Sequence, residues 1–438
     1  MEQTKNNLLK KAKWLYEKGM VHILGSGILS KVFTFIGNVI VVRVLTKAQY
    51  GVFGYVDNIM GFVQIVNALG ISYGILQFCS ETKDEGVKKG YYDFGLRFGL
   101  IFDVVLCGGL VLYALFAPLK IESARTALVI YSLYPIPAFL FQYFCIVLRY
   151  KRDNKKFAFL TNLQAGIYAV IEVAAAFWLK EVSMILALYV SSIICSALGL
   201  YYVNKNDRNL AKQTGALVAK PLTGKQKSEL LRYSGITCAN TMISNLLILL
   251  DVFLIGVYIS NPDVIASYKV ASTIPLALIF VPNSIIMFAY PYFAEHNTDR
   301  TWFITNTKRL IVASGALNLV ITLGLFIFAP KIIVFLWGSK YLSATTAFRI
   351  LSINYFISAT FRINAINIMC AIKKVKENLY INIVSGISNV ILDMVLIQRY
   401  GANGAAFATL CVVLITTGML VPVMYRCLNN IGKEALPQ

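Results

Sequence analysis

Charged and metal-binding residues are scarce in this chain. Only 14% of its 438 residues are charged and 58% are hydrophobic, whereas soluble domains have about 25% charged residues. It has two histidines, and its eight cysteines form no Cys-x-x-Cys pair. We therefore expect no metal site, and we expect the cysteines to be free thiols packed inside apolar helices.

Motifs of soluble enzymes are missing as well. The sequence has no Walker A loop, no Gly-x-Ser-x-Gly turn and no metal-ligand spacing. We therefore predict no catalytic residue, no cofactor and no enzymatic activity. The net charge of +20 would suggest nucleic acid in a soluble protein, but here the basic residues lie between apolar stretches, so no nucleic-acid partner is expected. Residues 1–20 also lack the pattern of a cleavable signal peptide.

Long apolar stretches fill the chain instead. Twelve of them have about the length of 20 residues that a membrane-spanning helix needs. The predicted fold is an all-α polytopic membrane protein with twelve transmembrane helices in two six-helix bundles. The predicted spans are 22–43, 52–77, 93–117, 126–148, 157–179, 182–203, 233–259, 269–293, 309–329, 347–371, 378–398 and 403–425.

The loop charges predict the orientation and the domains. Lysines and arginines gather on one side of the spans, which places both termini in the cytoplasm of a bacterial cell. The central basic loop divides the chain into two halves of six helices each. The predicted parts are a basic cytoplasmic segment (1–21), an N-terminal bundle (22–203), a cytoplasmic linker (204–232), a C-terminal bundle (233–425) and a cytoplasmic tail (426–438).

Short similarities suggest that the two halves are repeats. Tyr50-Gly51 and Tyr268-Lys269 occupy corresponding places, as do Asn162-Leu163 and Asn378-Leu379. Parallel repeats of this kind rock against each other around a central cavity in transporters. Prolines within the fourth and eighth spans predict helix kinks. These are Pro135, Pro137, Pro275 and Pro282.

Polar residues inside the spans are the candidate functional groups, because charges in a membrane are costly and usually face a cavity or a partner. Lys31 and Arg362 lie near the middle of their spans and would attract an anionic group. The candidate substrate-binding residues are Lys31, Thr34, Asn38, Asn354, Ser358 and Arg362.

Acidic residues inside the spans are candidates for binding a coupling ion, H+ or Na+. The four candidates are Asp57, Asp103, Glu172 and Asp251. A structural alternative is that these charges pair with the cations inside packed bundles. Asp393 lies close to Arg399 in the sequence, and we expect those two residues to form a structural ion pair. Asn240 and Ser244 share the helical face of Asp251.

Several segments resemble bacterial polysaccharide flippases of the O-antigen and capsule type, in the superfamily of multidrug and toxin extruders. The resemblance begins at Arg43-Val44-Leu45 with Tyr50-Gly51-Val52-Phe53, continues at Leu69-Gly70-Ile71, Asp251-Val252-Phe253 and Gly338-Ser339-Lys340-Tyr341, and ends at Tyr400-Gly401-Ala402-Asn403-Gly404-Ala405-Ala406-Phe407-Ala408-Thr409. The last segment is the most specific. In this family an arginine often stands where this chain has Gln77.

The resemblance implies a V-shaped transporter in the bacterial cytoplasmic membrane. Its substrate would be an undecaprenyl-pyrophosphate-linked oligosaccharide, moved from the cytoplasmic to the periplasmic leaflet by alternating access that an ion gradient drives. Membrane lipids, a polysaccharide polymerase and a chain-length regulator are the further partners that it implies.

Two alternatives remain open at this point. A cation-coupled multidrug exporter would have the same fold, but it would favour an acidic cavity, and Lys31 and Arg362 argue against that. A membrane glycan polymerase or ligase would need catalytic residues on a sizeable loop outside the cell, and all the loops predicted there are short.

Overall fold

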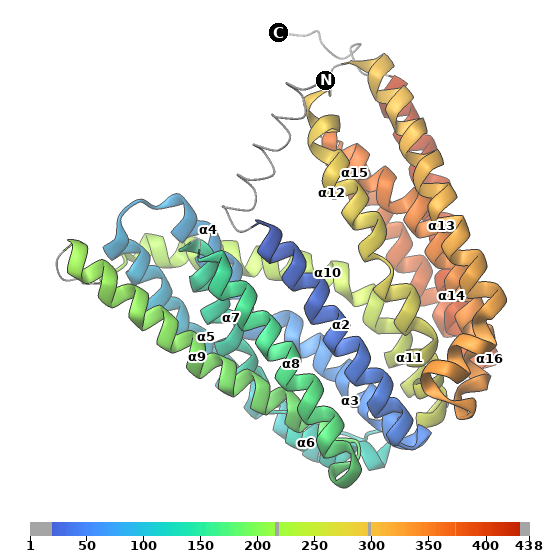
Figure 1. Ribbon diagram of the computed structural model, residues 1–438, viewed down its shortest axis with the longest axis horizontal. Helices are drawn as coiled ribbons and strands as arrows, with labels where there is room; N and C mark the ends of the chain where they lie inside the picture. The colour runs from blue at the N-terminus through green and yellow to red at the C-terminus, as the bar shows by residue number, and fades with distance from the viewer. Residues whose placement is uncertain (1–19, 152, 215–218, 297–298, 373, 430–438) are drawn as a thin grey trace. The chain divides into compact units, whose positions relative to one another are not determined.

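The structure is a computed structural model that describes residues 20–151, 153–214, 219–296, 299–372 and 374–429 (Figure 1). Within these residues all regular secondary structure is helical. The first half contains α2 (Met20–Val44), α3 (Lys47–Val66), η1 (Asn67–Gly70), α4 (Ile71–Glu81), α5 (Glu85–Phe116), η2 (Glu122–Ala124), α6 (Arg125–Tyr131), α7 (Pro135–Tyr150), α8 (Asn154–Leu179) and α9 (Val182–Thr214).

The second half begins with a helix that belongs to both parts of the molecule. Its elements are α10 (Gly224–Ile259), α11 (Pro262–Ala277), α12 (Phe280–Glu295), α13 (Arg300–Trp337), η3 (Ser339–Ala344), α14 (Thr345–Ile357), η4 (Ser358–Arg362), α15 (Ile363–Ala371) and α16 (Val375–Asn429). The chain forms two compact units, Met1–Leu249 and Leu250–Gln438, so the division falls within α10.

Side chains at the helix starts stabilise several of these helices. Thr46 and Gln49 form a capping box at the start of α3, in which each side chain bonds to the other residue's backbone amide. Asp153 and Asp299 accept hydrogen bonds from the first-turn amides of α8 and α13. Such caps satisfy amides that have no partner within the helix.

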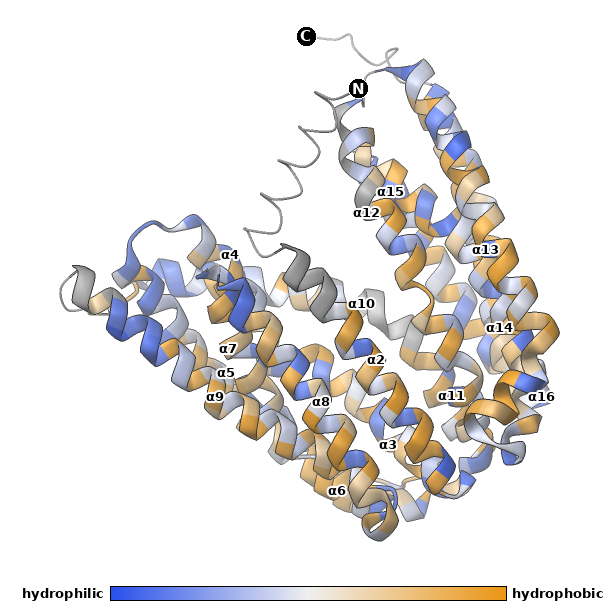
Figure 2. Ribbon diagram, in the orientation of Figure 1, coloured by the Kyte–Doolittle hydropathy of each residue, from blue (hydrophilic) through white to orange (hydrophobic). Residues whose placement is uncertain are grey.

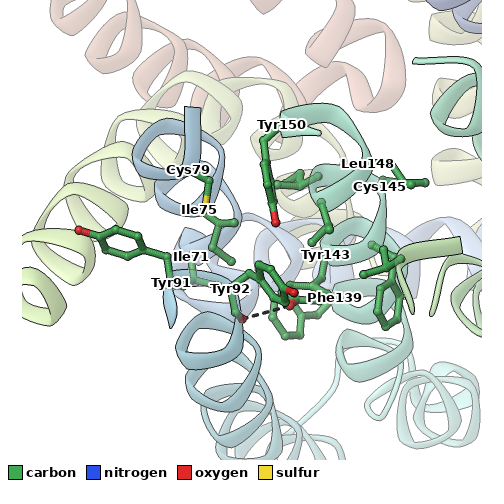
Figure 3. Close-up of a cluster of buried hydrophobic side chains, with 14 of the residues drawn as sticks. Ile71, Ile75, Cys79, Tyr91, Tyr92, Phe139, Tyr143, Cys145, Leu148 and Tyr150 are labelled. Carbon is green, nitrogen blue, oxygen red and sulfur yellow. Dashed lines mark hydrogen bonds between the residues drawn. The ribbon is translucent and has the colours of Figure 1, made fainter. Parts of the chain in front are cut away.

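Unit 1 is held together by a buried apolar cluster at the contacts of α4, α5, α7 and α9. Figure 3 shows part of it, with the Tyr143 hydroxyl donating a hydrogen bond of 3.0 Å to the carbonyl of Tyr92. Phe139 leaves no room for a side chain at Gly99, since an added Cβ would overlap its ring. α8 packs between α2 and α9 and joins this cluster through Leu160.

Polar contacts gather at one end of unit 1, where α4 and α9 end, and Figure 2 shows this end in blue. Lys151 pairs with Asp207, which also accepts a hydrogen bond of 2.5 Å from the Tyr92 hydroxyl. The segment before α10 is fastened here: Lys220 pairs with Asp84 at 2.5 Å, and this hydrogen bond lowers the pKa of Asp84.

The central loop is shorter than the predicted range of 204–232. α9 continues to Thr214 and α10 begins at Gly224. The backbone amide of Lys220 donates to the carbonyl of Gly86 at 3.0 Å, which attaches the remaining connection to α5. The predicted basic segment at residues 1–21 lies almost entirely outside the described residues.

Unit 2 has its own core. An apolar cluster joins α12, α13, α15 and α16 and includes Phe293, Phe303, Met369 and Met424. α14 packs against α11, α13 and α16. Trp337, at the end of α13, is completely buried.

Eight helical stretches among the described residues are long and apolar enough to cross a membrane, or nine if η2–α6 and α7 together form one bent span. One of the eight is Tyr380–Asn429, with 50 residues. A straight helix of that many residues would be about 75 Å long at 1.5 Å per residue, more than twice the hydrocarbon thickness of a bilayer. It contains two of the predicted spans, joined at Gly401, where the backbone turns at φ 60°. Twelve crossings stay a prediction.

The predicted kinks lie beside the prolines. The fourth span bends by 44° between Tyr131 and Pro135. The eighth span is interrupted at Leu278 and Ile279, between Pro275 and Pro282. A proline lacks the backbone N–H of a regular helix, which explains both positions.

The second predicted span, 52–77, is not a continuous helix. Ala68, Leu69 and Gly70 have left-handed backbone angles, with φ of 46°, 51° and 64°. This break separates α3 from α4. Left-handed angles are costly for Leu and for Ala, so surrounding contacts must hold the break in place.

Candidate functional site

The most unusual polar group of unit 2 is a buried acidic cluster. Asp251 on α10 accepts hydrogen bonds from the Tyr268 hydroxyl on α11 and, at 2.9 Å, from the Thr409 hydroxyl on α16. The carboxyl group of Asp393 and the side chain of Asn389, both on α16, lie next to Asp251. All three helices thus converge on one carboxylate.

The cluster has more acceptors than donors. One oxygen of Asp251, both oxygens of Asp393 and the amide oxygen of Asn389 are buried with no hydrogen-bond partner among the described residues. Buried polar atoms are normally satisfied, and two adjacent carboxylates cannot both remain charged without compensation. These oxygens are suited to binding a monovalent cation or to sharing a proton.

Asp393 therefore does not have the role that we expected for it. Arg399 is exposed, and no ion pair joins the two residues in the described chain. Side chains six residues apart on a helix point in directions about 120° apart around its axis, whereas side chains four residues apart lie on one face. Asp393 consequently shares its face with Asn389 and faces Asp251.

Arg362 ends a short π-helical turn, η4, between α14 and α15. Its Nε atom is buried and has no hydrogen-bond partner in the part of the chain that the structure describes. π-turns within α-helices are frequent at functional sites, and a buried guanidinium without a partner is costly. Asn354, one turn before η4, also has a buried oxygen for which the described chain supplies no partner, and Ser358 begins η4.

Lys31 lies on α2 in unit 1, where its side chain is exposed. It forms no ion pair with any described residue. Thr34, on the same face, donates to the carbonyls of Ser30 and Lys31 at 3.0 and 3.1 Å. Asn38 donates to the Tyr50 hydroxyl at 3.4 Å, and its side-chain oxygen is buried with no partner among the described residues.

Glu172 on α8 is completely buried beside α2. Its carboxyl group lies next to the Tyr168 hydroxyl. Neither carboxyl oxygen has a hydrogen bond of ordinary geometry to a described residue. The carboxyl group lies directly against the backbone of α2 at Gly37, where a Cβ would overlap it. Glu172 is thus a second buried acid, separate from the Asp251 cluster.

The other two predicted acids have identifiable contacts. Asp103 on α5 is completely buried and accepts a hydrogen bond of 2.7 Å from the amide of Ala68, inside the broken helix. This contact gives Asp103 a structural role, although its second oxygen has no partner within the described residues. Asp57 accepts a hydrogen bond of 3.4 Å from the Tyr131 hydroxyl.

Asn240 and Ser244, predicted on the face of Asp251, lie where the structure does not describe side chains. All eight cysteines are free thiols, five of them buried, as predicted. Within the described residues, no three His, Cys, Asp or Glu side chains gather closely enough to hold a metal ion.

Comparison with known proteins identifies the family. The sequence profile of the family described as "Polysaccharide biosynthesis protein" matches residues 17–297, well over half of the chain. The chain belongs to this family. The match confirms the resemblance drawn from the motifs around Tyr50-Gly51 and Asp251. No curated protein matches the sequence significantly.

Solved structures of transporters share the fold. The lipid II flippase MurJ, in an inward closed conformation, matches with a TM-score of 0.71 at 16% identity, over 94% of this chain and 90% of that one. An inward-facing multidrug resistance MATE transporter of the MOP superfamily matches with a TM-score of 0.74 at 13% identity, over 93% and 96%. A MOP superfamily transporter from Pyrococcus furiosus matches with a TM-score of 0.56 at 13% identity, over 94% of each chain.

These likenesses confirm the fold class. The chain is an all-helical, multi-pass membrane protein with the fold of flippases and transporters.

Proposed function

We propose that this protein is a flippase for undecaprenyl-pyrophosphate-linked oligosaccharides. It would move repeat units of O-antigen, capsule or a related glycan across the bacterial inner membrane by alternating access. Family membership connects the chain with polysaccharide biosynthesis, and the solved lipid II flippase MurJ shares its fold. The predicted central cavity and the cytoplasmic termini remain parts of this proposal.

The observation that carries the proposal is the Nε atom of Arg362, which is buried and has no hydrogen-bond partner among the described residues. A guanidinium that stays unpaired in a membrane helix fits an anionic ligand far better than a cationic drug. Lys31 supplies a second cation without an ion pair in the described chain. Both cations are suited to a pyrophosphate group or to acidic sugars, which favours a flippase over a multidrug exporter.

We further propose that the Asp251–Asp393 pair binds the coupling ion. Oxygens without donors at both carboxyl groups and at Asn389 suit either Na+ or a proton. Glu172 is the second candidate for protonation, because its oxygens are buried and have no hydrogen bond of ordinary geometry among the described residues. Neither site implies a catalytic step, in keeping with a transporter rather than a glycan polymerase or ligase.

The test of the anion sites measures glycan export in a strain that depends on this gene. Lys31→Ala and Arg362→Ala should each lower export about ten-fold or more, because a hydrogen bond to a charged group contributes about 1.5–3 kcal/mol. Lys225→Ala and Arg232→Ala are matched controls at exposed positions and should leave export unchanged.

Protein abundance in the membrane must be measured alongside. Normal abundance with lost export supports the proposal. Full export by both Lys31→Ala and Arg362→Ala would contradict it, and loss of folded protein in both variants would show that the two cations have structural roles.

A further inference from the structure

The break in the second span creates polar backbone inside a helix that is otherwise apolar. Three consecutive residues, Ala68 to Gly70, leave the right-handed helix. Two contacts hold them: Asp103 accepts from the amide of Ala68 at 2.7 Å, and the Asn67 side chain donates to the carbonyl of Pro135 at 2.9 Å. Irregular backbone at membrane depth is tolerated only where it is buried in protein or lines a water-filled cavity.

A cavity of about 310 Å³ lies beside this break, within unit 1. This volume is within the range of small-ligand pockets, roughly 300–1,000 Å³. Gly61 and Gly70 contribute backbone to its wall, and Ile65 and Leu249 contribute apolar surface. The polar side chains that line it are Gln64, Asn67, Ser72, Tyr73, Gln142 and Thr241.

The lining of this cavity differs chemically from the cations Lys31 and Arg362 and from the Asp251–Asp393 pair. None of the lining residues is charged, and the polar side chains are amides and hydroxyls, which both donate and accept hydrogen bonds. Gln64 brings a buried Nε2 atom that has no hydrogen-bond partner among the residues that the structure describes. An amide nitrogen in that state indicates an acceptor that is not supplied by the described protein.

Tyr73 adds an aromatic ring to the same wall. Its side chain is 39% exposed, although Ile71 and Ile75 on the same helix are fully buried. An aromatic face next to neutral hydrogen-bonding groups suits a ligand with apolar C–H faces and many hydroxyls. A carbohydrate has both features. A pyrophosphate would instead need cations, and none lines this cavity.

We propose that the cavity beside the broken α3–α4 span binds sugar residues of the transported oligosaccharide. This inference rests on the proposed flippase function and assigns the glycan to unit 1 at Gln64, Ser72, Tyr73 and Gln142. Asn67 and Ser72, which stand on either side of the break, both line this cavity.

Two probes separate sugar recognition from lipid recognition. The first is undecaprenyl pyrophosphate without sugar. The second is the lipid-linked oligosaccharide extracted from cells in which this gene is deleted. Binding of each is measured with the full-length protein in lipid nanodiscs. The double variant Gln64→Met, Gln142→Met should bind the second probe about ten- to thirty-fold more weakly. Methionine has nearly the shape of glutamine, but each substitution removes a hydrogen-bonding amide.

The first probe should bind the double variant as it binds the unchanged protein. Gln77→Met is the matched control, since Gln77 is exposed near the end of α4 and outside the cavity. If the double variant does not fold, Ser72→Ala removes a single hydroxyl from the same wall and should weaken only the second probe.

Three results would overturn the inference. Equal loss of both probes would show a structural role, and no loss of either probe would show that the cavity does not contact sugar. In both cases the flippase proposal would stand. If the unchanged protein binds neither probe, the proposed function itself is wrong.

Discussion

Neutralising one carboxyl group of the unit 2 cluster should strongly weaken the response of this protein to its coupling ion. Asp393→Asn keeps the size of the side chain but removes a buried carboxyl group that lies against Asp251. The amide supplies donors to oxygens that now have none. The variant should therefore fold as well as the unchanged protein, or better, while losing affinity for the ion.

The size of the effect follows from Coulomb's law. At an effective dielectric constant of about 20, a carboxylate about 4 Å from a cation contributes about 4 kcal/mol. Desolvation offsets part of this gain. If half remains, about 2 kcal/mol, the ion binds about 30-fold more weakly. Ion at 100 times its dissociation constant stabilises the unchanged protein by about 2.7 kcal/mol, and the variant by only about 0.9 kcal/mol.

Thermal unfolding of the purified protein measures this difference. The transition temperature is recorded against Na+ concentration at constant ionic strength and then against pH without Na+. The unchanged protein should be stabilised by a few degrees by one of these ions, whereas Asp393→Asn and Asp251→Asn should respond weakly. Asp263→Asn, in the first turn of α11 and outside the cluster, is the matched control. An equal response of all four proteins would refute the reasoning.

Three further predictions concern folding. Gly37→Ala should destabilise the protein by about 1–3 kcal/mol in thermal unfolding, because its Cβ overlaps the Glu172 carboxyl, whereas Gly27→Ala has open space and should be neutral or stabilising. Gly404→Ala should lower the yield of folded protein in size-exclusion chromatography, because its Cβ would overlap a backbone carbonyl of α16. Asp84→Asn removes the ion pair with Lys220 and should speed hydrogen exchange at the Lys220 amide. Because the pKa of Asp84 is lowered, acid should produce the same change in the unchanged protein only below about pH 4.

Apolar length and loop charge are strong signals, and they predicted the helical membrane fold. They could not show the break at Ala68 and Leu69, because neither residue favours left-handed angles and only Gly70 hints at a turn. The contacts that hold the break come from Asp103 and Pro135, which lie 35 and 68 residues away from their partners. Local sequence does not contain that information.

The acidic cluster was predicted only in part. Asp251 was a candidate because a carboxylate in a span is costly. Asp393 was assigned to Arg399 by closeness in sequence, although its four-residue spacing from Asn389 was the better guide. Thr409 belongs to the motif that carries the family resemblance, but nothing local connects it with Asp251, which is 158 residues away. The meeting of α10 and α16 needed the structure.

The leaflet distribution of the undecaprenyl-linked oligosaccharide tests the central claim most directly. A membrane-impermeant glycan probe, applied to spheroplasts with and without this gene, reports how much of the lipid is exposed on the outer leaflet. We predict that the lipid accumulates on the cytoplasmic leaflet in the deletion and that the intact gene restores its exposure. An unchanged distribution in the deletion, in a strain without a second transporter for this lipid, would contradict the assignment as a flippase.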